Sequence, residues 1–361
     1  MRGTMASKWI RSDRVQWLGA LCLSILAVTN DASPAPRRFE AVEPHMGTLV
    51  RVTVYAATED SATEAFRAAF GRIGSLDRIL SDYRPDSELN QLTKVAVNRP
   101  TRVSDDLFAV LEASQKLAQA TNGAFDVTLG PVTRLWREAR RRGHLPERDA
   151  LKEAASRTGF RNLHLDAERR TATLDMPGMA LDVGAIGKGY AASEALETLT
   201  RLGVRSALVA LSGDLAFSGA PPGQRGWRIG IQTGDGPALT APRTLELTNA
   251  AVSTSGSSEQ HLDVDGHRYS HIIDPSSRMG VTGDLAVTVI ARNGMDADGL
   301  DTAVSVLGVE RGMALIDAYP DAACLIAQPT PDGMRVITSS RFPPGATPIS
   351  PPSPRLRRAS P

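Results

Sequence analysis

The sequence is short of several features that define protein classes. Its 361 residues include only two cysteines, and aromatic residues make up 5% of the chain. Two cysteines cannot build a disulfide scaffold. No G-x-G-x-x-G or G-x-x-x-x-G-K-[ST] stretch stands at a predicted strand-to-helix turn, which disfavours the standard dinucleotide and P-loop folds. The 42% hydrophobic content can still bury a large core, so disorder over the whole chain is excluded.

Strong charge of either sign is also missing from the chain as a whole, whose net charge is +1. The positive excess lies at the two ends. Residues 41–340 hold 31 basic and 37 acidic groups and are therefore mildly acidic. An acidic body argues against nucleic acid as a partner.

The N-terminal segment is typical of an export signal. Lys8, Arg11 and Arg14 precede an apolar run over 17–28, which is short for a membrane-spanning helix. Residues 1–32 are predicted to be a signal peptide, and an uncleaved membrane anchor is the alternative. Cleavage would remove Cys22 and leave Cys324 as a buried, unpaired thiol.

The C-terminal segment 341–361 has seven prolines. Proline removes backbone donors and favours extended conformations, so this segment is predicted to be a disordered tail without a catalytic role. Residues 40–335 remain as a single predicted domain.

Strand and helix signals alternate irregularly along this domain. Residues 45–56, 206–211, 227–232 and 285–291 have strand patterns, whereas 61–80, 104–121, 188–202 and 298–307 have helix patterns. The basic stretch 134–142 is predicted to be a solvated helix face. Without a steady βαβ rhythm, the pattern predicts an α+β fold.

A glycine-rich segment, ALDVGAIGKGY over 180–190, precedes one predicted helix. Glycines let the backbone approach a ligand closely, and Lys188 near a helix N-terminus is well placed for a phosphate. Asp182 could bind a sugar hydroxyl or a ring N–H. A helix-entry turn with a surface lysine remains the alternative.

A histidine segment, HIIDP over 271–275, follows polar residues. His271 could act as a general base near neutral pH, although a structural histidine is the more common case.

An acidic segment, DGLDT over 298–302, opens another predicted helix. Asp298 and Thr302 are four residues apart and share a helix face, where their oxygens suit Mg²⁺ beside substrate phosphates. Asp301 lies next to that face. Helix capping by Asp298 is the alternative.

Three turn-rich pieces lie earlier in the chain: MGT at 46–48, YRPDSELN at 83–90 and GAFDVTLGP at 123–131. Each has an aromatic or sulfur side chain that could face a planar ring. Taken singly, each is more often part of a core or a turn.

The order of these motifs, together with SGD at 212–214 and STSG at 253–256, resembles the ApbE family of FAD:protein FMN transferases over about residues 40–330. The resemblance implies an α+β, T-fold-like architecture with mixed, largely antiparallel sheets, packed helices and an active-site cleft. It implies transfer of FMN from FAD to a Ser or Thr hydroxyl of an acceptor protein, with release of AMP.

The resemblance also implies roles for individual residues. Those that match positions holding FAD are Met46, Ala124, Phe125, Asp126, Asp182 and Lys188. Those that match the Mg²⁺ site are Ala185, through its carbonyl, with Asp298 and Thr302. His271 matches the catalytic histidine, and Asp301 is a second catalytic candidate.

These roles imply FAD as substrate, Mg²⁺ as cofactor, and an acceptor flavoprotein subunit of a membrane redox complex as partner. We expect an exported protein that is periplasmic or associated with the periplasmic side of the inner membrane. The alternatives are an FAD pyrophosphatase that yields FMN and AMP, and a non-catalytic protein that binds or delivers FAD.

Two positions depart from the family pattern. Ser212 stands where the family usually has the first of two glycines, and Arg278 stands where it favours glycine in the loop after the histidine. An arginine there could contact a phosphate or hinder the nucleotide.

Overall fold

The core of the molecule is an eight-stranded sheet with the strand order β1-β2-β6-β7-β10-β13-β14-β15. The structure, a computed structural model, describes residues 34–231, 243–256, 260–344 and 347–348. Every neighbouring pair in this sheet is antiparallel. Its strands are β1 (Arg37–His45), β2 (Thr48–Ala56), β6 (Ala207–Leu211), β7 (Asp214–Phe217), β10 (Ala250–Gly256), β13 (Ala286–Ala291), β14 (Ala323–Thr330) and β15 (Gly333–Thr338).

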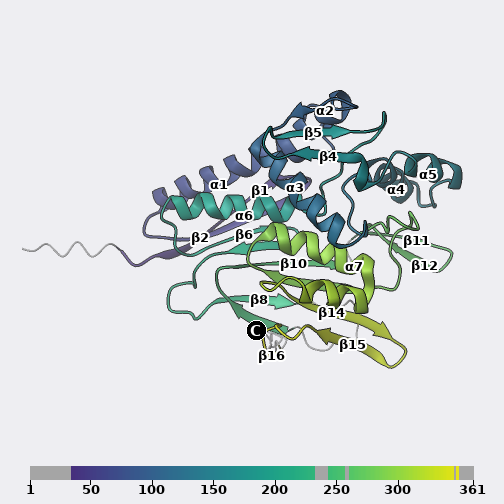
Figure 1. Ribbon diagram of the computed structural model, residues 1–361. Helices are drawn as coiled ribbons and strands as arrows, with labels where there is room; N and C mark the ends of the chain where they lie inside the picture. The colour runs from purple at the N-terminus through teal and green to yellow at the C-terminus, as the bar shows by residue number, and fades with distance from the viewer. Residues whose placement is uncertain (1–33, 232–242, 257–259, 345–346, 349–361) are drawn as a thin grey trace, which may run out of the picture. The chain divides into compact units, whose positions relative to one another are not determined.

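Three long helices cover one face of this sheet: α1 (Glu59–Leu80), α6 (Gly187–Arg201) and α7 (Gly294–Asp317). Figure 1 shows them above the large sheet, with α6 next to α1 and α7 over β10. Their inward side chains form the main core with the facing side of the strands, among them Ile73, Leu199 and Val304. The amphipathic spacing seen in the sequence over 61–80 places the buried side chains of α1, Ile73 among them, on one stripe of that helix.

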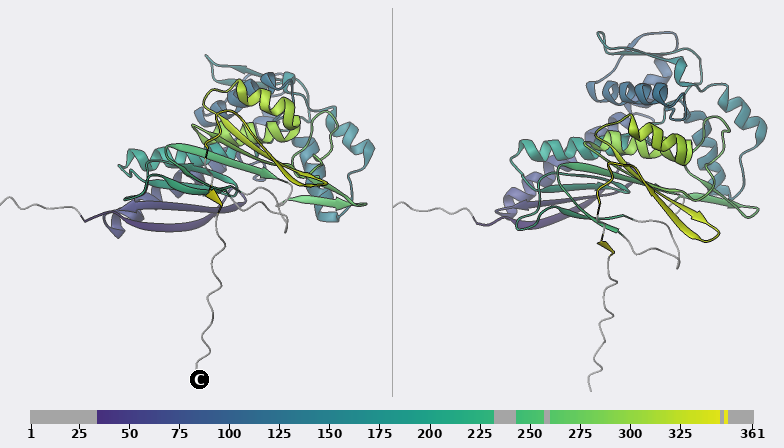
Figure 2. Two further views of the ribbon diagram at one scale, coloured as in Figure 1. Left: turned by 90° about the horizontal axis from the view of Figure 1, so that it is seen from below. Right: turned by 60° about the horizontal axis from the view of Figure 1, so that its bottom comes forward.

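The opposite face of the sheet is covered by a small sheet of β8 (Trp227–Ile231), β9 (Arg243–Leu247) and β16 (Thr347–Pro348). Figure 2 shows these strands on the side away from the helices. Because β13 and β14 are covered on both faces, consecutive residues along them are buried, as Cys324 and Leu325 are. Cys324 packs on the helix side and Leu325 on the side of the small sheet.

The remaining elements are inserted between α1 and α6, or between β10 and β13. They are α2 (Glu88–Val95), β3 (Thr101–Arg102), α3 (Asp105–Ala120), α4 (Gly130–Arg142), α5 (Arg148–Ala155), a 3₁₀ turn η1 (Phe160–Asn162), β4 (Leu163–Asp166), β5 (Thr171–Leu174), β11 (His261–Val264) and β12 (His267–Ser270). Strands β3, β5 and β4 form a third antiparallel sheet, and β11 pairs with β12. Helices α4 and α5 pack with the β11–β12 hairpin around Trp136.

Several sequence expectations need correction at element boundaries. The strand expected over 45–56 is divided by a two-residue turn at Met46 and Gly47, with His45 paired to Thr48. The helix expected from Asp298 begins at Gly294, because Asn293 is the capping residue that accepts the Asp296 N–H. Capping by Asp298 is therefore wrong, and its carboxylate is available for other contacts.

The C-terminal expectation is wrong for its first residues. Phe342 is 8% exposed in the core under the small sheet, and Arg341 donates hydrogen bonds to the carbonyls of Ile316, Tyr319 and Ala322. The chain therefore stays anchored past residue 340. Residues 349–361 and the predicted signal at 1–32 lie outside the described residues. Among the helices of the described ranges, none is both long and apolar enough to span a bilayer.

Candidate active site

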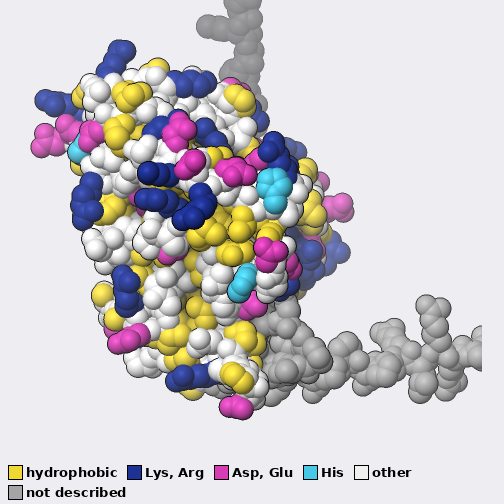
Figure 3. Space-filling view, turned by 90° about the vertical axis from the view of Figure 1, so that its right-hand side faces the viewer, with side chains coloured by type: hydrophobic (Ala, Val, Ile, Leu, Met, Phe, Trp, Pro, Cys, Tyr) yellow, Lys and Arg dark blue, Asp and Glu magenta, His cyan; other side chains and the backbone are white. Residues whose placement is uncertain are grey.

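A cavity of about 880 Å³ opens where the β1–β2 turn, the loops around α4, the first turn of α6 and the second and third turns of α7 meet. It is lined by all eleven residues that the sequence singled out: Met46, Ala124, Phe125, Asp126, Asp182, Ala185, Lys188, His271, Asp298, Asp301 and Thr302. Figure 3 shows the end of the molecule that carries α4, α5 and the β11–β12 hairpin, where hydrophobic side chains gather in the middle of the face and Lys and Arg side chains border them. The fold thus brings segments spread over residues 46–302 to one place.

One wall of the cavity is a buried ionic cluster around Lys188. Its Nζ lies 2.6 Å from Oδ2 of Asp214 and 3.8 Å from Oδ1 of Asp298. Lys188 stands in the first turn of α6, Asp214 at the start of β7, and Asp298 on α7. A sequence-distant cation and two carboxylates therefore meet at one point.

Ser253 of β10 connects this cluster to Asp301. Its hydroxyl oxygen lies 2.5 Å from Oδ1 of Asp214 and 2.6 Å from Oδ2 of Asp301, while Thr302 donates to the other Asp301 oxygen at 3.2 Å. Asp301 is 1% exposed and Asp214 is 3% exposed. The cluster is thus a continuous hydrogen-bonded network whose carboxylates are buried.

Charge balance explains the ionisation of this cluster. Burial and the neighbouring charge of Asp214 raise the pKa of Asp298 to about 7, and burial together with Asp298 raises that of Asp301 well above its usual range. Burial disfavours the charged lysine, but the carboxylates of Asp298 and Asp214 outweigh it and raise the pKa of Lys188. One cation thus faces three carboxylates, and further positive charge would stabilise their ionised forms.

The residues present fit Mg²⁺ by their donor chemistry. Within the described ranges, no group of three or more His, Cys, Asp or Glu side chains is arranged to hold a metal ion. The donors that the resemblance implies are of a mixed kind: the Ala185 carbonyl, the Asp298 carboxylate and the Thr302 hydroxyl, all at the cavity wall. Such hard oxygen donors suit a magnesium ion that is also held by substrate phosphates.

The position of Asp298 depends on a close crossing of α6 and α7. A Cβ at Gly189 would come 2.0 Å from the carbonyl oxygen of Gly294, so only glycine allows the two backbones to touch. The Gly189 N–H donates to Oδ2 of Asp298 at 2.9 Å. Gly189 of the glycine-rich segment therefore serves helix packing at the site.

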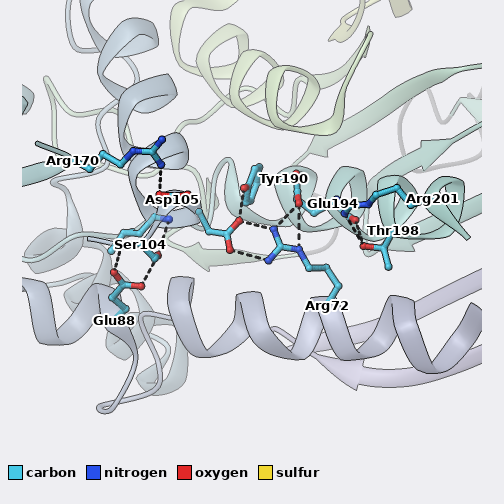
Figure 4. A network of polar contacts seen from close by, with 11 residues as sticks. Arg72, Glu88, Ser104, Asp105, Arg170, Tyr190, Glu194, Thr198 and Arg201 are labelled. Atoms are coloured by element: carbon cyan, nitrogen blue, oxygen red, sulfur yellow. Dashed lines mark hydrogen bonds and ion pairs between the residues drawn. The ribbon is translucent and has the colours of Figure 1, made fainter. Parts of the chain in front are cut away.

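The start of α6 is also held from outside by a polar network (Figure 4). Arg72 of α1 contacts Glu194 of α6 and Asp106 of α3 at 2.5 Å each, and the Tyr190 hydroxyl donates to Asp106 at 2.6 Å. These contacts join α1, α3 and α6 one turn beyond Lys188. They fix the helix whose N-terminus lines the cavity.

His271 follows β12 and lines the cavity. Its Nδ1 lies 3.2 Å from the carbonyl oxygen of Gln260, which can only accept, so Nδ1 carries the proton and Nε2 has the free lone pair. Burial lowers the pKa of His271 to about 4. The ring is therefore neutral at pH 7 and can accept a proton at Nε2.

Asp182 is held by protein donors. Its Oδ2 accepts hydrogen bonds from Arg137 and Thr133 at 2.8 Å each, and its Oδ1 accepts the Gly184 N–H at 2.9 Å. Arg137 also pairs with Asp82 and stacks over the Tyr83 ring, 4.3 Å from its centroid. Asp182 thereby joins the glycine-rich turn to α4.

Asp126 and Phe125 are similarly engaged within the protein. The Asp126 carboxylate accepts hydrogen bonds from the N–H and hydroxyl of Thr128 and from the Phe160 N–H. Burial raises its pKa despite these bonds. Phe125 is 2% exposed in the main core, and Ala124 precedes it on the cavity wall. This loop is therefore rigid where it borders the cavity.

Three non-glycine residues near the cavity have left-handed backbone conformations. Met46 has φ 50°, and the two family departures, Ser212 and Arg278, have φ 56° and 64°. Glycine adopts this region without the steric cost that other residues bear, which explains why a glycine suits both departure positions. Ser212 lines the cavity, whereas Arg278 uses its carbonyl to accept the Trp136 indole N–H at 2.8 Å.

The sequence does not single out several of the cavity residues. In the sequence, Asp214 is only part of a turn and Ser253 only part of the STSG motif. The basic stretch 134–142 is not simply a solvated face, because Arg137 is paired inward and Arg140 lines the cavity. The spacing of three between these two arginines places them on one side of a helix and could have indicated this.

Comparisons with known proteins agree with this geometry. The FAD:protein FMN transferases of Treponema pallidum and Klebsiella pneumoniae are 35% and 32% identical, over 89% and 88% of this chain and 93% and 91% of their own lengths. The solved structures of the flavin transferase ApbE from Vibrio cholerae and the flavinyl transferase ApbE from Pseudomonas stutzeri each align with a TM-score of 0.75 and 30% identity, over 84% and 85% of this chain and 98% and 96% of theirs. They confirm the expected α+β fold. A model described as the ApbE family matches residues 46–326, and the chain therefore belongs to the ApbE family.

Proposed function

We propose that this protein is an Mg²⁺-dependent FAD:protein FMN transferase. It would transfer FMN from FAD to a Thr or Ser hydroxyl of an acceptor flavoprotein, form a phosphodiester bond and release AMP. The observation that carries the proposal is the meeting of Lys188, Asp298, Thr302 and His271 around one cavity large enough for a dinucleotide. The printed names of the relatives, which describe flavin transfer, support it.

In this proposal, the protein contributes mainly binding and positioning. The acceptor hydroxyl oxygen attacks the FMN-side phosphorus, the bond from that phosphorus to the bridging oxygen breaks, and the electron pair leaves with AMP. His271 accepts the hydroxyl proton at Nε2, because its Nδ1 is already committed to Gln260. Asp301 is the second candidate for this task, although its carboxylate is engaged by Ser253 and Thr302.

The positive groups would stabilise the charge that develops on the pyrophosphate. Lys188 is held by Asp214 at the cavity wall and presents its charge there. The Ala185 carbonyl, Asp298 and Thr302 would hold Mg²⁺, which would polarise the phosphoryl oxygens when bound. Met46, Ala124, Phe125, Asp126 and Asp182 would shape the flavin-binding part of the cavity.

The proposed partner is an acceptor flavoprotein subunit of a membrane redox complex. The proposed location is outside the cytoplasm, in the periplasm or at the periplasmic side of the inner membrane. The basic and apolar N-terminal segment supports export.

The test is to mix the protein with FAD, Mg²⁺ and a candidate acceptor domain and to weigh the acceptor by mass spectrometry. An Mg²⁺-dependent increase by one FMN supports transfer. Free FMN and AMP without an adduct would assign pyrophosphatase activity instead, and unchanged bound FAD would assign a binding or delivery protein.

Asp298→Asn tests the metal assignment. It should abolish Mg²⁺-dependent turnover, whereas Asp317→Asn, at the exposed end of the same helix, should not change it. Full activity in Asp298→Asn would contradict the assignment.

A further inference from the structure

Helix α4 presents two arginines to the cavity, and their charges are balanced differently. Arg137 is neutralised by Asp82 and Asp182 on either side. Arg140, one turn further along, also lines the cavity. Among the described residues, no hydrogen bond or ion pair connects Arg140 to any other group. Its guanidinium is therefore an uncompensated cation at the cavity wall.

The surroundings of Arg140 explain why nothing in the protein pairs with it. The carboxylates of Asp82 and Asp182 already accept Arg137, which is fixed further by stacking on Tyr83. Arg140 is half-buried, and burial and the charge of Arg137 lower its pKa. The positive charge is thus partly desolvated and lacks an internal counter-charge, a state that an anionic ligand would relieve.

Arg140 and Lys188 both lie close enough to His271 for their charges to lower the pKa of that histidine. Lys188 stands on α6 and Arg140 on α4, so the proposed proton acceptor is near a cation from each element. A guanidinium offers a planar pair of N–H donors that matches two phosphate oxygens. The dianionic pyrophosphate is the group of FAD that such a pair of cations would bind.

We propose that Arg140 is a binding residue for the pyrophosphate of FAD, acting from α4 while Lys188 acts from α6. The inference rests on the proposed function, since it assumes that the cavity takes FAD. It adds a specificity: the cavity should favour phosphorylated flavins over riboflavin, because riboflavin leaves Arg140 without a counter-charge. A carboxylate of the acceptor protein is the competing occupant.

The experiment measures dissociation constants for FAD, FMN and riboflavin by quenching of flavin fluorescence, without any acceptor. Arg140→Ala should raise the dissociation constant for FAD about 10-fold or more, because a charge-assisted hydrogen bond is lost. It should raise the dissociation constant for riboflavin by less than about 2-fold. Arg140→Lys should recover part of the FAD affinity, since it restores the charge without the paired donors.

The matched control is Arg141→Ala on the same helix. Arg141 is exposed and pairs with Glu138, so this variant removes one positive charge outside the cavity and should leave all three affinities unchanged. Circular dichroism and unfolding temperature establish that each variant is folded.

Unchanged FAD affinity in folded Arg140→Ala, or equal loss for FAD and riboflavin, would overturn the inference. Unchanged FAD affinity with a raised KM for the acceptor would assign Arg140 to the acceptor carboxylate instead. If the unaltered protein bound no FAD, the proposed function itself would fail and this inference with it.

Discussion

Lys188 and Asp214 form an ion pair of 2.6 Å in which the aspartate is 3% exposed. The lysine comes from a helix and the aspartate from a strand. Asp298 lies 3.8 Å from the lysine, and Ser253 links Asp214 to Asp301. A single cation thus supports three buried carboxylates, and this imbalance gives the first prediction.

Lys188→Met should lower the free energy of unfolding by about 3 kcal/mol, because it leaves buried carboxylates without a cation. Asp214→Asn should lower the free energy of unfolding by less. The double variant should lose less unfolding free energy than the two single losses added together. Urea unfolding at pH 7.5 measures this. A double-variant loss equal to the sum of the single losses would show that the pair is not coupled.

Added Mg²⁺ should raise the unfolding free energy of the unaltered protein, and it should raise that of Asp298→Asn by a smaller amount.

Gly189→Ala should destabilise the protein by more than about 3 kcal/mol or prevent folding, because the added Cβ would meet the Gly294 carbonyl oxygen at 2.0 Å. Gly71→Ala in α1 is the control. It has no atom within 4 Å of the added Cβ and should stabilise the helix by about 0.5–1 kcal/mol. Thermal unfolding measures the stability of the two variants. An equal change in unfolding temperature for both would contradict the close crossing of α6 and α7.

His271 should make stability fall in acid. Its folded-state pKa of about 4 is below the usual value of 6.5, so the unfolded chain binds the proton more readily between these values. The unfolding free energy should therefore decrease as the pH falls from about 7 to about 4, and His271→Asn should remove part of this decrease. Urea unfolding between pH 4 and 8 tests it. A constant difference between the two proteins over this range would contradict the prediction.

Arg278→Gly should leave the free energy of unfolding unchanged or raise it by up to about 1 kcal/mol. The reason is the φ of 64°, which costs an arginine more than a glycine, while the carbonyl that accepts from Trp136 is kept. Arg278→Val should be destabilising, since a β-branched side chain tolerates this region poorly. If Arg278→Gly lowered the free energy of unfolding more than Arg278→Val does, the arginine side chain would have a stabilising role of its own.

Cys324 should be unreactive in the folded protein. It is fully buried on β14, and burial raises the pKa of its thiol to about 12. In a Cys22→Ser background, reaction with a disulfide reagent should occur only at the rate of unfolding and should accelerate with urea. Fast labelling without denaturant would mean that β14 opens locally.

Much of the fold could be predicted because local signals agree with the final structure. The 61–80 pattern matches α1 to within two residues. The 104–121 pattern matches α3, which Ser104 caps by accepting the Leu107 N–H. The predicted element boundaries are wrong at two places. At Met46 a short turn continues the alternating pattern, and in α7 the capping residue Asn293 lies before the charged residues that begin at Asp296.

The site could be predicted only in part, because the partners of its residues depend on tertiary packing. The order of the motifs indicated which residues would meet, and the cavity contains them all. Nothing local in the sequence says that Asp214 would pair with Lys188, since 26 residues and a change from helix to strand separate them. The inward orientation of Arg137 and Arg140 was hidden by the neighbouring exposed arginines.

The strand order has a consequence for how the protein comes to be folded. Strand β2 pairs with β6, which places Val52 opposite Val209. Helices α6 and α7 touch at Gly189 and Gly294, which are more than 100 residues apart in the sequence. Closing such long loops is slow, and folding rates fall as contacts become more distant along the chain. A nascent chain that ends before β13 and α7 lacks Asp298 and Thr302, so the candidate active-site cavity is completed only after α7 has been synthesised.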